Sequence, residues 1–178
     1  FLGQYGPTKG IIGEIICKLL QNDESIAATP EDVIMTVGCQ EAMCICLLAL
    51  AANPGDVLLV ENPAYVGVVG AAKLFGIEVV GIPTDENGII LESLSNITNE
   101  LKKIKKTPKL LYLSPDFSNP TGNTIDLQQR LELLKITKKL GLMILEDHAY
   151  NYFFYNDSRI RCLKSLPNSE HVIYLGSF

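Results

Sequence analysis

Apolar positions along the chain follow two patterns that alternate from one end to the other. In the first pattern, apolar residues recur three and four positions apart, which is the period of a helix with one buried face. It predicts helices over residues 11–23, 40–52, 64–76, 91–106 and 126–141. The second pattern is a short continuous apolar run, and it predicts strands over residues 33–37, 57–61, 77–83, 109–114, 142–147 and 171–176.

The predicted strands are apolar at consecutive positions, whereas a strand with one wet face alternates between apolar and polar residues. Both faces of the sheet are therefore expected to be buried, which is typical of parallel strands joined by helices. The sequence predicts an α/β fold, with a mainly parallel sheet and helices on both faces. Because its 178 residues contain no repeat, linker or low-complexity tract, the chain is expected to form one domain over residues 1–178.

Composition and charge exclude several classes of function. The net charge is −5 with no basic stripe, so no nucleic-acid partner is expected. The longest apolar run, Ala42–Ala52, is far shorter than the roughly 20 residues of a membrane-spanning helix, so no membrane partner is expected. The five cysteines lack zinc-ligand spacing and there are two histidines, so no metal centre is expected. We expect reduced thiols and a cytoplasmic location, or the mitochondrial matrix if the source is eukaryotic.

Polar and aromatic residues follow most of the predicted strands. In an open parallel sheet, ligands bind at the edge formed by the carboxyl ends of the strands. Such residues are the first candidates for a site, and they are Gly38, Cys39, Gln40, Tyr65, Asn119, Asp147, Tyr150 and Ser177.

Asp147 is the sharpest of these candidates. A carboxylate at the end of a doubly buried strand is costly unless a cation meets it, so Asp147 suggests a partner for a protonated ring nitrogen. The alternative is a helix or turn cap. Taken alone, Gly38 is better explained as an ordinary N-cap, although a helix N-terminus also favours an anion. Tyr65, taken alone, is better explained as a core aromatic.

The stretch PDFSNPTG, residues 115–122, places a rigid polar turn between a strand and a helix. Pro120 has a fixed φ and biases Asn119 toward an extended conformation. Gly122 permits the turn before the next helix. The Asn119 amide is therefore expected to be held still at the carboxyl edge of the sheet. No role for Asp116 follows from the sequence.

Taken together, these segments resemble the large domain of fold-type I pyridoxal-5′-phosphate (PLP) enzymes. The closest resemblance is to class I/II aminotransferases near the kynurenine/2-aminoadipate branch. The matching stretches, in chain order, are QYGPTKG, TVGCQEAM, NPGDVLLVENPAY, PDFSNPTG, EDHAY and YLGSF. The resemblance implies an aspartate aminotransferase-like large domain, PLP as cofactor, transamination between an amino acid and a 2-oxo acid, and a homodimer with shared active sites.

The resemblance also implies a role for each candidate. Asp147 is similar to the aspartate that pairs with the pyridine nitrogen, and Asn119 and Tyr150 to the pair that binds the cofactor's 3′ oxygen. The resemblance further implies that the Tyr65 ring stacks on the pyridine ring. It implies that a phosphate-binding cup is formed by Gly38, Cys39, Gln40 and Ser177. Tyr5 is implied to contact the phosphate bound by the neighbouring subunit.

The chain departs from the family pattern at three places. Cys39 stands where the family commonly has serine, so the backbone amides must contribute more to the phosphate cup. Asp116 stands where many relatives have an uncharged residue. The Schiff-base lysine of the family lies about two residues beyond Ser177, outside the printed chain, and so does the C-terminal small domain. We therefore expect the chain as printed not to transaminate, and its parent protein to do so.

Three other functions remain open at this point. The same scaffold performs other PLP chemistry, such as elimination, decarboxylation or oxidase/hydroxylase reactions. A PLP-sensing domain of a transcription regulator would carry a basic DNA-binding segment upstream. A degenerate, non-catalytic paralogue would lack the lysine in its full sequence.

Overall fold

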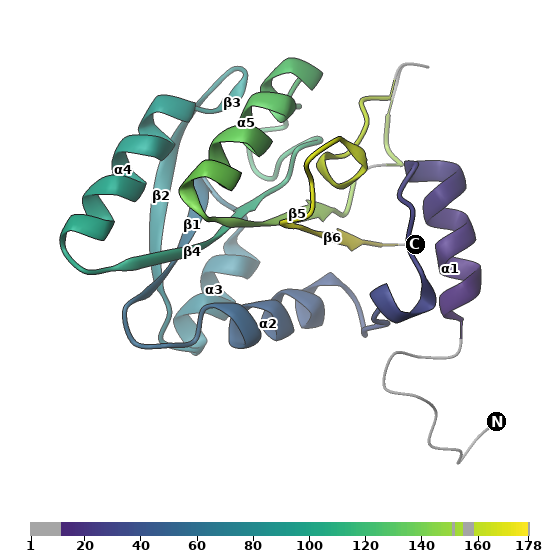
Figure 1. Cartoon of the computed structure of the whole chain (residues 1–178), viewed down its shortest axis with the longest axis horizontal. Coiled ribbons are helices and arrows are strands. Elements are labelled where there is room, and N and C mark those ends of the chain that lie inside the picture. Colours follow the sequence, from purple (N-terminus) through teal and green to yellow (C-terminus); the bar gives the residue numbers. More distant parts are fainter. Residues whose placement is uncertain (1–11, 151, 155–158, 178) are drawn as a thin grey trace, which may run out of the picture.

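The computed structural model describes residues 12–150, 152–154 and 159–177. In this part of the chain, six strands form one sheet in the spatial order β3-β2-β1-β4-β5-β6 (Figure 1). The strands are β1 (Asp56–Asn62), β2 (Glu78–Asp85), β3 (Gly88–Ile89), β4 (Thr107–Leu113), β5 (Met143–His148) and β6 (Val172–Gly176). All neighbouring pairs are parallel except β2 and β3, which are antiparallel. The predicted fold class is confirmed.

Helices cover both faces of the sheet. In Figure 1, α4 and α5 lie on one face, α2 and α3 on the other, and α1 stands beside β6. The helices are α1 (Gly13–Leu19), α2 (Cys39–Leu50), α3 (Val66–Leu74), α4 (Leu91–Lys103) and α5 (Leu127–Leu140). A π-helical turn, Leu20–Glu24, continues α1, and the 3₁₀ turns are Pro30–Asp32 and Leu163–Ser165.

Strand β1 shows how continuous apolar runs serve a sheet that is covered twice. Side chains alternate between the two faces of a strand. Val57 and Leu59 therefore join the cluster against α4 and α5, whereas Leu58 and Val60 join the cluster against α2 and α3. Burial of both faces is why no position in the middle of the strand is polar.

The ends of α5 follow directly from its sequence. Asp126 is the N-cap, and its Oδ1 accepts a hydrogen bond from the Gln129 amide at 2.7 Å. Gly141 ends the helix in the left-handed conformation, with φ of 73°, which glycine adopts without strain. The predicted range 126–141 therefore matches the helix closely.

Two predictions about strands need correction. The strand predicted over residues 33–37 is wrong: this segment forms no ladder with any described residue, and only its apolar run resembles a strand. The two-residue strand β3 was not predicted, although the pair Asn87-Gly88 is a strong hairpin signal. The turn itself consists of Glu86 and Asn87, and Gly88 opens β3 with a positive φ of 100°, which glycine adopts without strain.

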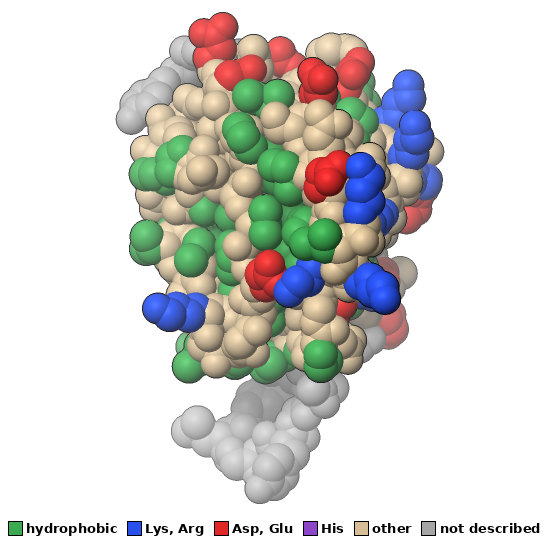
Figure 2. All heavy atoms as spheres, turned by 90° about the vertical axis from the view of Figure 1, so that its left-hand side faces the viewer, with side chains coloured by type: hydrophobic (Ala, Val, Ile, Leu, Met, Phe, Trp, Pro, Cys, Tyr) green, Lys and Arg blue, Asp and Glu red, His purple; other side chains and the backbone are tan. Residues whose placement is uncertain are grey.

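Among the described residues, β2 pairs with β3 only at Thr84 and Asp85, so the first part of β2 has an open edge. Pro83 removes a backbone donor, which discourages pairing by another strand. At the start of β2, Glu78 pairs with Lys106 at 2.5 Å. Figure 2 shows this side of the molecule, with hydrophobic side chains in the middle and Lys and Arg side chains along one border. Across the described residues, none of the helices combines the length and apolar character needed to span a bilayer.

Candidate functional site

Asp147 lies near the carboxyl end of β5, on the sheet face covered by α2 and α3. Its side chain is 5% exposed, and its Oδ2 accepts a hydrogen bond from the Tyr112 hydroxyl at 2.6 Å. Its Oδ1 accepts a longer bond, 3.2 Å, from the Ala149 amide. Burial raises the pKa of the Asp147 carboxyl, although the bonds from Tyr112 and Ala149 and the charge of His148 act to lower it. A cation placed beside this carboxyl would therefore stabilise its ionised form.

The N-terminus of α2 lies against the end of β6, close to Asp147. Gly38 is the N-cap, with a φ of 102°, and the Cys39 Sγ donates a hydrogen bond to the Gly176 carbonyl at 3.5 Å. Burial, and after it the negative charge of Asp147, raises the pKa of the Cys39 thiol. Cys39 is therefore a neutral thiol at neutral pH. Its sulfur faces a carbonyl, which leaves the backbone amides of the helix start as the stronger donors to an anion.

Gln40 and Tyr65 meet at Gly67, in the first turn of α3. The Gln40 Nε2 donates to the Gly67 carbonyl at 3.2 Å. A Cβ atom on Gly67 would lie 2.3 Å from the Tyr65 ring and 2.7 Å from the Gln40 Oε1. Because real Cβ atoms do not approach other atoms so closely, only glycine lets the ring and the amide pack here. Tyr65 is half-buried and contacts the α2–α3 core cluster.

Asn119 lies on a turn held by its own backbone. The Ser118 amide donates to the Asn123 carbonyl at 2.9 Å, and the Gly122 amide donates to the Ser118 carbonyl at 2.5 Å. The Asn119–Pro120 peptide bond is cis. The Asn119 side chain is half-buried and has no hydrogen-bond partner among the described residues. Among the described residues, the Asn119 amide is thus a polar group without a hydrogen-bond partner at the edge of the sheet.

The turn is also held by a buried acid that the sequence did not single out. The Glu61 Oε1 accepts hydrogen bonds from the Ser114 amide at 3.1 Å and from the Ser118 hydroxyl at 2.8 Å. Glu61 is 4% exposed, and burial raises the pKa of its carboxyl. The sequence signal that could have identified Glu61 is an acidic residue near the end of a strand that is otherwise apolar.

Three of the predicted site residues are less closely tied to this group. Tyr150 is 39% exposed and packs edge-on against Phe153, with ring centroids 6.5 Å apart. Within the described ranges no hydrogen bond joins Tyr150 to Asn119, so their pairing stays a prediction. Ser177 is exposed beyond the end of β6. Tyr5 lies outside the described residues.

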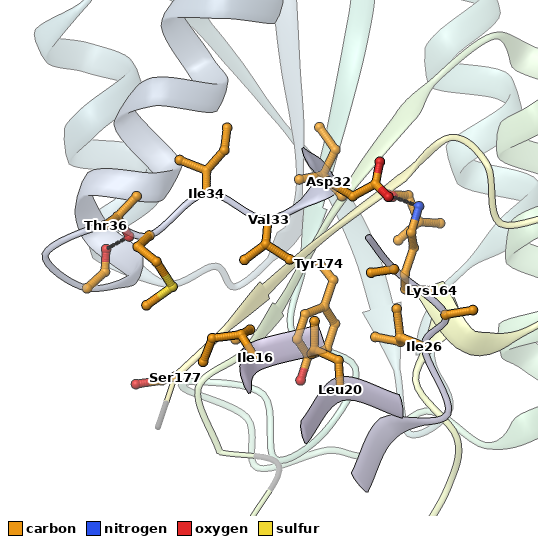
Figure 3. A pocket seen from close by; sticks show the side chains of 17 residues that line it. Ile16, Leu20, Ile26, Asp32, Val33, Ile34, Thr36, Lys164, Tyr174 and Ser177 are labelled. Atoms are coloured by element: carbon orange, nitrogen blue, oxygen red, sulfur yellow. Dashed lines mark hydrogen bonds between the residues drawn. The ribbon is translucent and has the colours of Figure 1, made fainter. Parts of the chain in front are cut away.

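A cavity of about 610 Å³ lies beside β6, between this strand, α1 and the segment 26–38 (Figure 3). Gly38 and Ser177 line one end of it, whereas Asp147, Asn119 and Tyr65 do not line it. Tyr174 extends through the cavity toward Leu20. The lining combines apolar side chains with polar ones, namely Asp32, Thr36, Lys164 and Ser177, and of the predicted site residues it includes Gly38 and Ser177. In the ranges described, no group of three or more His, Cys, Asp or Glu side chains could hold a metal ion.

Asp116, which had no role from the sequence, is the partner of a buried arginine. The Arg130 guanidinium, in α5, donates to the Asp116 Oδ1 at 2.6 Å. The His148 Nε2 lies 3.7 Å from the other Asp116 oxygen and 3.0 Å from the Glu146 Oε1. Successive residues of a strand point to opposite faces. His148 therefore joins this charged cluster on the α5 side, while Asp147 faces α2.

The fold and the strand-end cluster define an α/β protein of the aminotransferase large-domain type. The chain belongs to the family described as aminotransferase class I and II, whose family model matches residues 2–178. It is 42% identical over 177 residues, 99% of this chain, to a (S)-3,5-dihydroxyphenylglycine transaminase of Amycolatopsis orientalis, of which it covers 40%.

Solved structures agree with this assignment. An archaeal alanine:glyoxylate aminotransferase superposes with a TM-score of 0.91 at 34% identity, over 98% of this chain and 43% of its own. LysN, the α-aminoadipate aminotransferase of Thermus thermophilus, was solved with N-(5′-phosphopyridoxyl)-L-leucine; its TM-score is 0.81 at 30% identity, over 96% of this chain and 42% of its own. The family is therefore PLP-dependent. The chain spans about two fifths of the length of these relatives.

Proposed function

We propose that this chain forms the PLP-binding large domain of an enzyme that transfers an amino group between an amino acid and a 2-oxo acid. The observation that carries the proposal is Asp147, a buried carboxyl at the end of β5 whose pKa is raised by burial. A carboxyl in this state is stabilised by a cation, and a protonated pyridine nitrogen is such a cation. PLP, when bound, supplies the ring that accepts electrons from the substrate Cα.

The donor set around Asp147 fits a phosphorylated pyridine. The start of α2, from Gly38, offers backbone amides to the phosphate, and Ser177 extends this group beyond the end of β6. The unpartnered Asn119 amide suits the 3′ oxygen, which Tyr150 is proposed to share. Tyr65 offers an aromatic face. In our proposal Asp147 keeps the proton on the ring nitrogen, while the other residues orient the ring and exclude water.

A homodimer is part of this proposal. Several large apolar side chains near the site are exposed, notably Val37, at 93%, and Val66, at 79%. Surface of this kind is typical of a protein–protein contact. We propose that a second copy covers it and contributes Tyr5 to the phosphate.

The cysteines are all free, which fits a reducing compartment, and we propose the cytoplasm.

Binding of pyridoxamine 5′-phosphate tests the cofactor site directly, because this amine form needs no lysine linkage. The chain contains no tryptophan, so the fluorescence of the ligand can be followed without an overlapping protein signal. We expect saturable binding that weakens at least roughly tenfold in Asp147→Asn, the effect of losing one charged hydrogen bond. Equal affinity in Asp147→Asn and in the unchanged protein would refute the site.

A further inference from the structure

Glu61 is a buried acid that the proposed cofactor contacts leave without a role. It is the last residue but one of β1, and one oxygen, Oε1, accepts both of its hydrogen bonds from described residues. Burying a carboxyl is costly unless its bonds repay the loss of water. Both donors, Ser114 and Ser118, belong to the segment that follows β4. Glu61 therefore holds the segment that follows β4.

This segment is the base of the turn that carries Asn119. Ser118 accepts a bond from Gly122 at its carbonyl and donates one to Asn123 through its amide, so the turn closes on this residue. Its hydroxyl, in turn, donates to Glu61 at 2.8 Å. Loops at the surface move unless side chains hold them. Glu61 is thus the link between the turn and the rigid end of β1.

A second arm of the same network reaches Asp147. Tyr112 lies two residues before Ser114 on β4, and its hydroxyl donates to the Asp147 Oδ2 at 2.6 Å. Burial raises the pKa of the Tyr112 phenol, as do the charge of Asp147 and its hydrogen bond, so the phenol stays a donor. The charge of Glu61 also raises the pKa of this phenol. The Tyr112–Asp147 bond and the Glu61–Ser114 bond both involve the segment 112–114, so this segment connects the Asp147 carboxyl with the base of the Asn119 turn.

We propose that Glu61 is a positioning residue that fixes Asn119 relative to Asp147, so that both meet one pyridine ring at a set spacing. The inference rests on the proposed function, because the ring is that of the proposed cofactor. A rigid ligand held at two points needs both partners placed to within about 0.5 Å. A buried acid on a central strand supplies that placement, whereas a free surface turn does not.

Amide hydrogen exchange without any ligand tests the mechanical part of the proposal. In Glu61→Ala, we expect the amides of Ser118 and Gly122 to exchange roughly tenfold faster, because the turn loses its anchor. Asp56→Ala is the matched control, since Asp56 is a buried acid at the other end of the same strand. It is expected to leave these two amides unchanged. Unchanged exchange in Glu61→Ala would overturn the proposal.

Ser118→Ala removes the shorter bond from the side of the turn. It is the milder change, and it decides the question if Glu61→Ala does not fold. We expect it to accelerate the Gly122 amide, and Glu61→Gln, which keeps an acceptor oxygen, to resemble the unchanged protein. A Gly122 amide that exchanges equally slowly in Ser118→Ala would count against the anchor.

Ligand discrimination tests the cofactor part. The unchanged protein is expected to bind pyridoxamine 5′-phosphate roughly tenfold more tightly than its 3-deoxy analogue, because Asn119 bonds the ring oxygen. In Glu61→Ala this ratio should fall to about one, while Asp56→Ala keeps it. A retained ratio in Glu61→Ala would overturn the positioning role. If the unchanged protein binds neither ligand, the proposed function fails and the cofactor role of Glu61 with it, whereas the exchange experiment still decides whether Glu61 anchors the turn.

Discussion

The Arg130 guanidinium donates to the Asp116 carboxylate at 2.6 Å, and no part of the arginine side chain is exposed. The same guanidinium donates to the carbonyls of Pro115 and Ile125, at 3.2 Å and 2.9 Å. Pro115 and Ile125 flank the turn that carries Asn119. Arg130 therefore closes this turn from the α5 side of the sheet, while Glu61 holds its base.

Arg130→Met is expected to destabilise the protein by about 3–5 kcal/mol, because it removes a fully buried guanidinium and leaves the mostly buried Asp116 carboxylate without this cation. Urea unfolding measures this loss. Lys135→Met is the matched control, since Lys135 is an exposed cation on the same helix, and its replacement should change stability by at most ~0.5 kcal/mol. If the two variants unfold at the same urea concentration, the ion pair contributes nothing to stability.

Gly67→Ala is expected to displace the Tyr65 ring, because the new Cβ would lie 2.3 Å from that ring. Near-ultraviolet circular dichroism should show the change in the tyrosine environment, and pyridoxamine 5′-phosphate should bind more weakly. Gly70→Ala in the same helix meets no atom within 4 Å. It should stabilise α3 by about 0.5–1 kcal/mol, since alanine is the better helix former. Equal spectra for the two variants would mean that the ring does not depend on Gly67.

The stability of the ligand-free protein should depend on the charge of Asp147. Burial raises the pKa of this carboxyl above its ordinary 3.8, so the folded state holds its proton more tightly than the unfolded state. The contribution of Asp147 to the free energy of unfolding is therefore fully present below pH 3.8, and it is lost as the pH rises through the raised pKa.

Asp147→Asn should abolish this loss. We expect the variant to be more stable than the unchanged protein at pH 7 by about 1 kcal/mol, with a smaller difference at pH 4. Urea unfolding at the two pH values measures both differences, with the exposed Glu86→Gln as control. A variant less stable at pH 7 would show that Asp147 is already satisfied without a cation.

Cys39 should react slowly with iodoacetamide. Burial and the charge of Asp147 raise the pKa of its thiol above the ordinary 9.0, so the reactive thiolate forms only at higher pH. In Asp147→Asn the midpoint of reactivity should fall toward 9.0, because one of the two causes is removed. Cys46 serves as the internal control, since burial alone raises its pKa. Peptide-resolved mass spectrometry reads both thiols in one sample, and equal shifts at both would contradict the role of Asp147.

The sheet and most helices could be predicted because their signals are local. Continuous apolar runs mark β1, β4 and β5, and Asp126 and Gly141 mark the ends of α5. The segment 33–37 has the same apolar run but no described neighbour to pair with. A strand is defined by its partner, and the sequence of one segment does not contain that partner.

The residues of the candidate site also divide into those with a local sequence signal and those without one. Asp147 lies near the end of a strand, Asn119 follows one, and both lie in recognisable motifs, so the sequence singles out both as candidates. Glu61, Tyr112 and Arg130 were not, because their role depends on contacts with residues 14 to 57 positions away. In the sequence, Tyr112 is one more apolar position of β4, and Arg130 is one more charge on α5. Only their burial beside partners from other elements separates them from ordinary core and surface residues.

The contacts that build the strand-end site join remote parts of the chain. The Glu61–Ser118 bond spans 57 residues and the Cys39–Gly176 bond spans 137. Contacts of such high order form late, since the chain must first be closed into long loops. During synthesis, the N-terminus of α2 cannot contact Gly176 until that residue has left the ribosome. Binding of the proposed cofactor would then require a completed parallel sheet, and it would distinguish fully folded domains from partly folded ones.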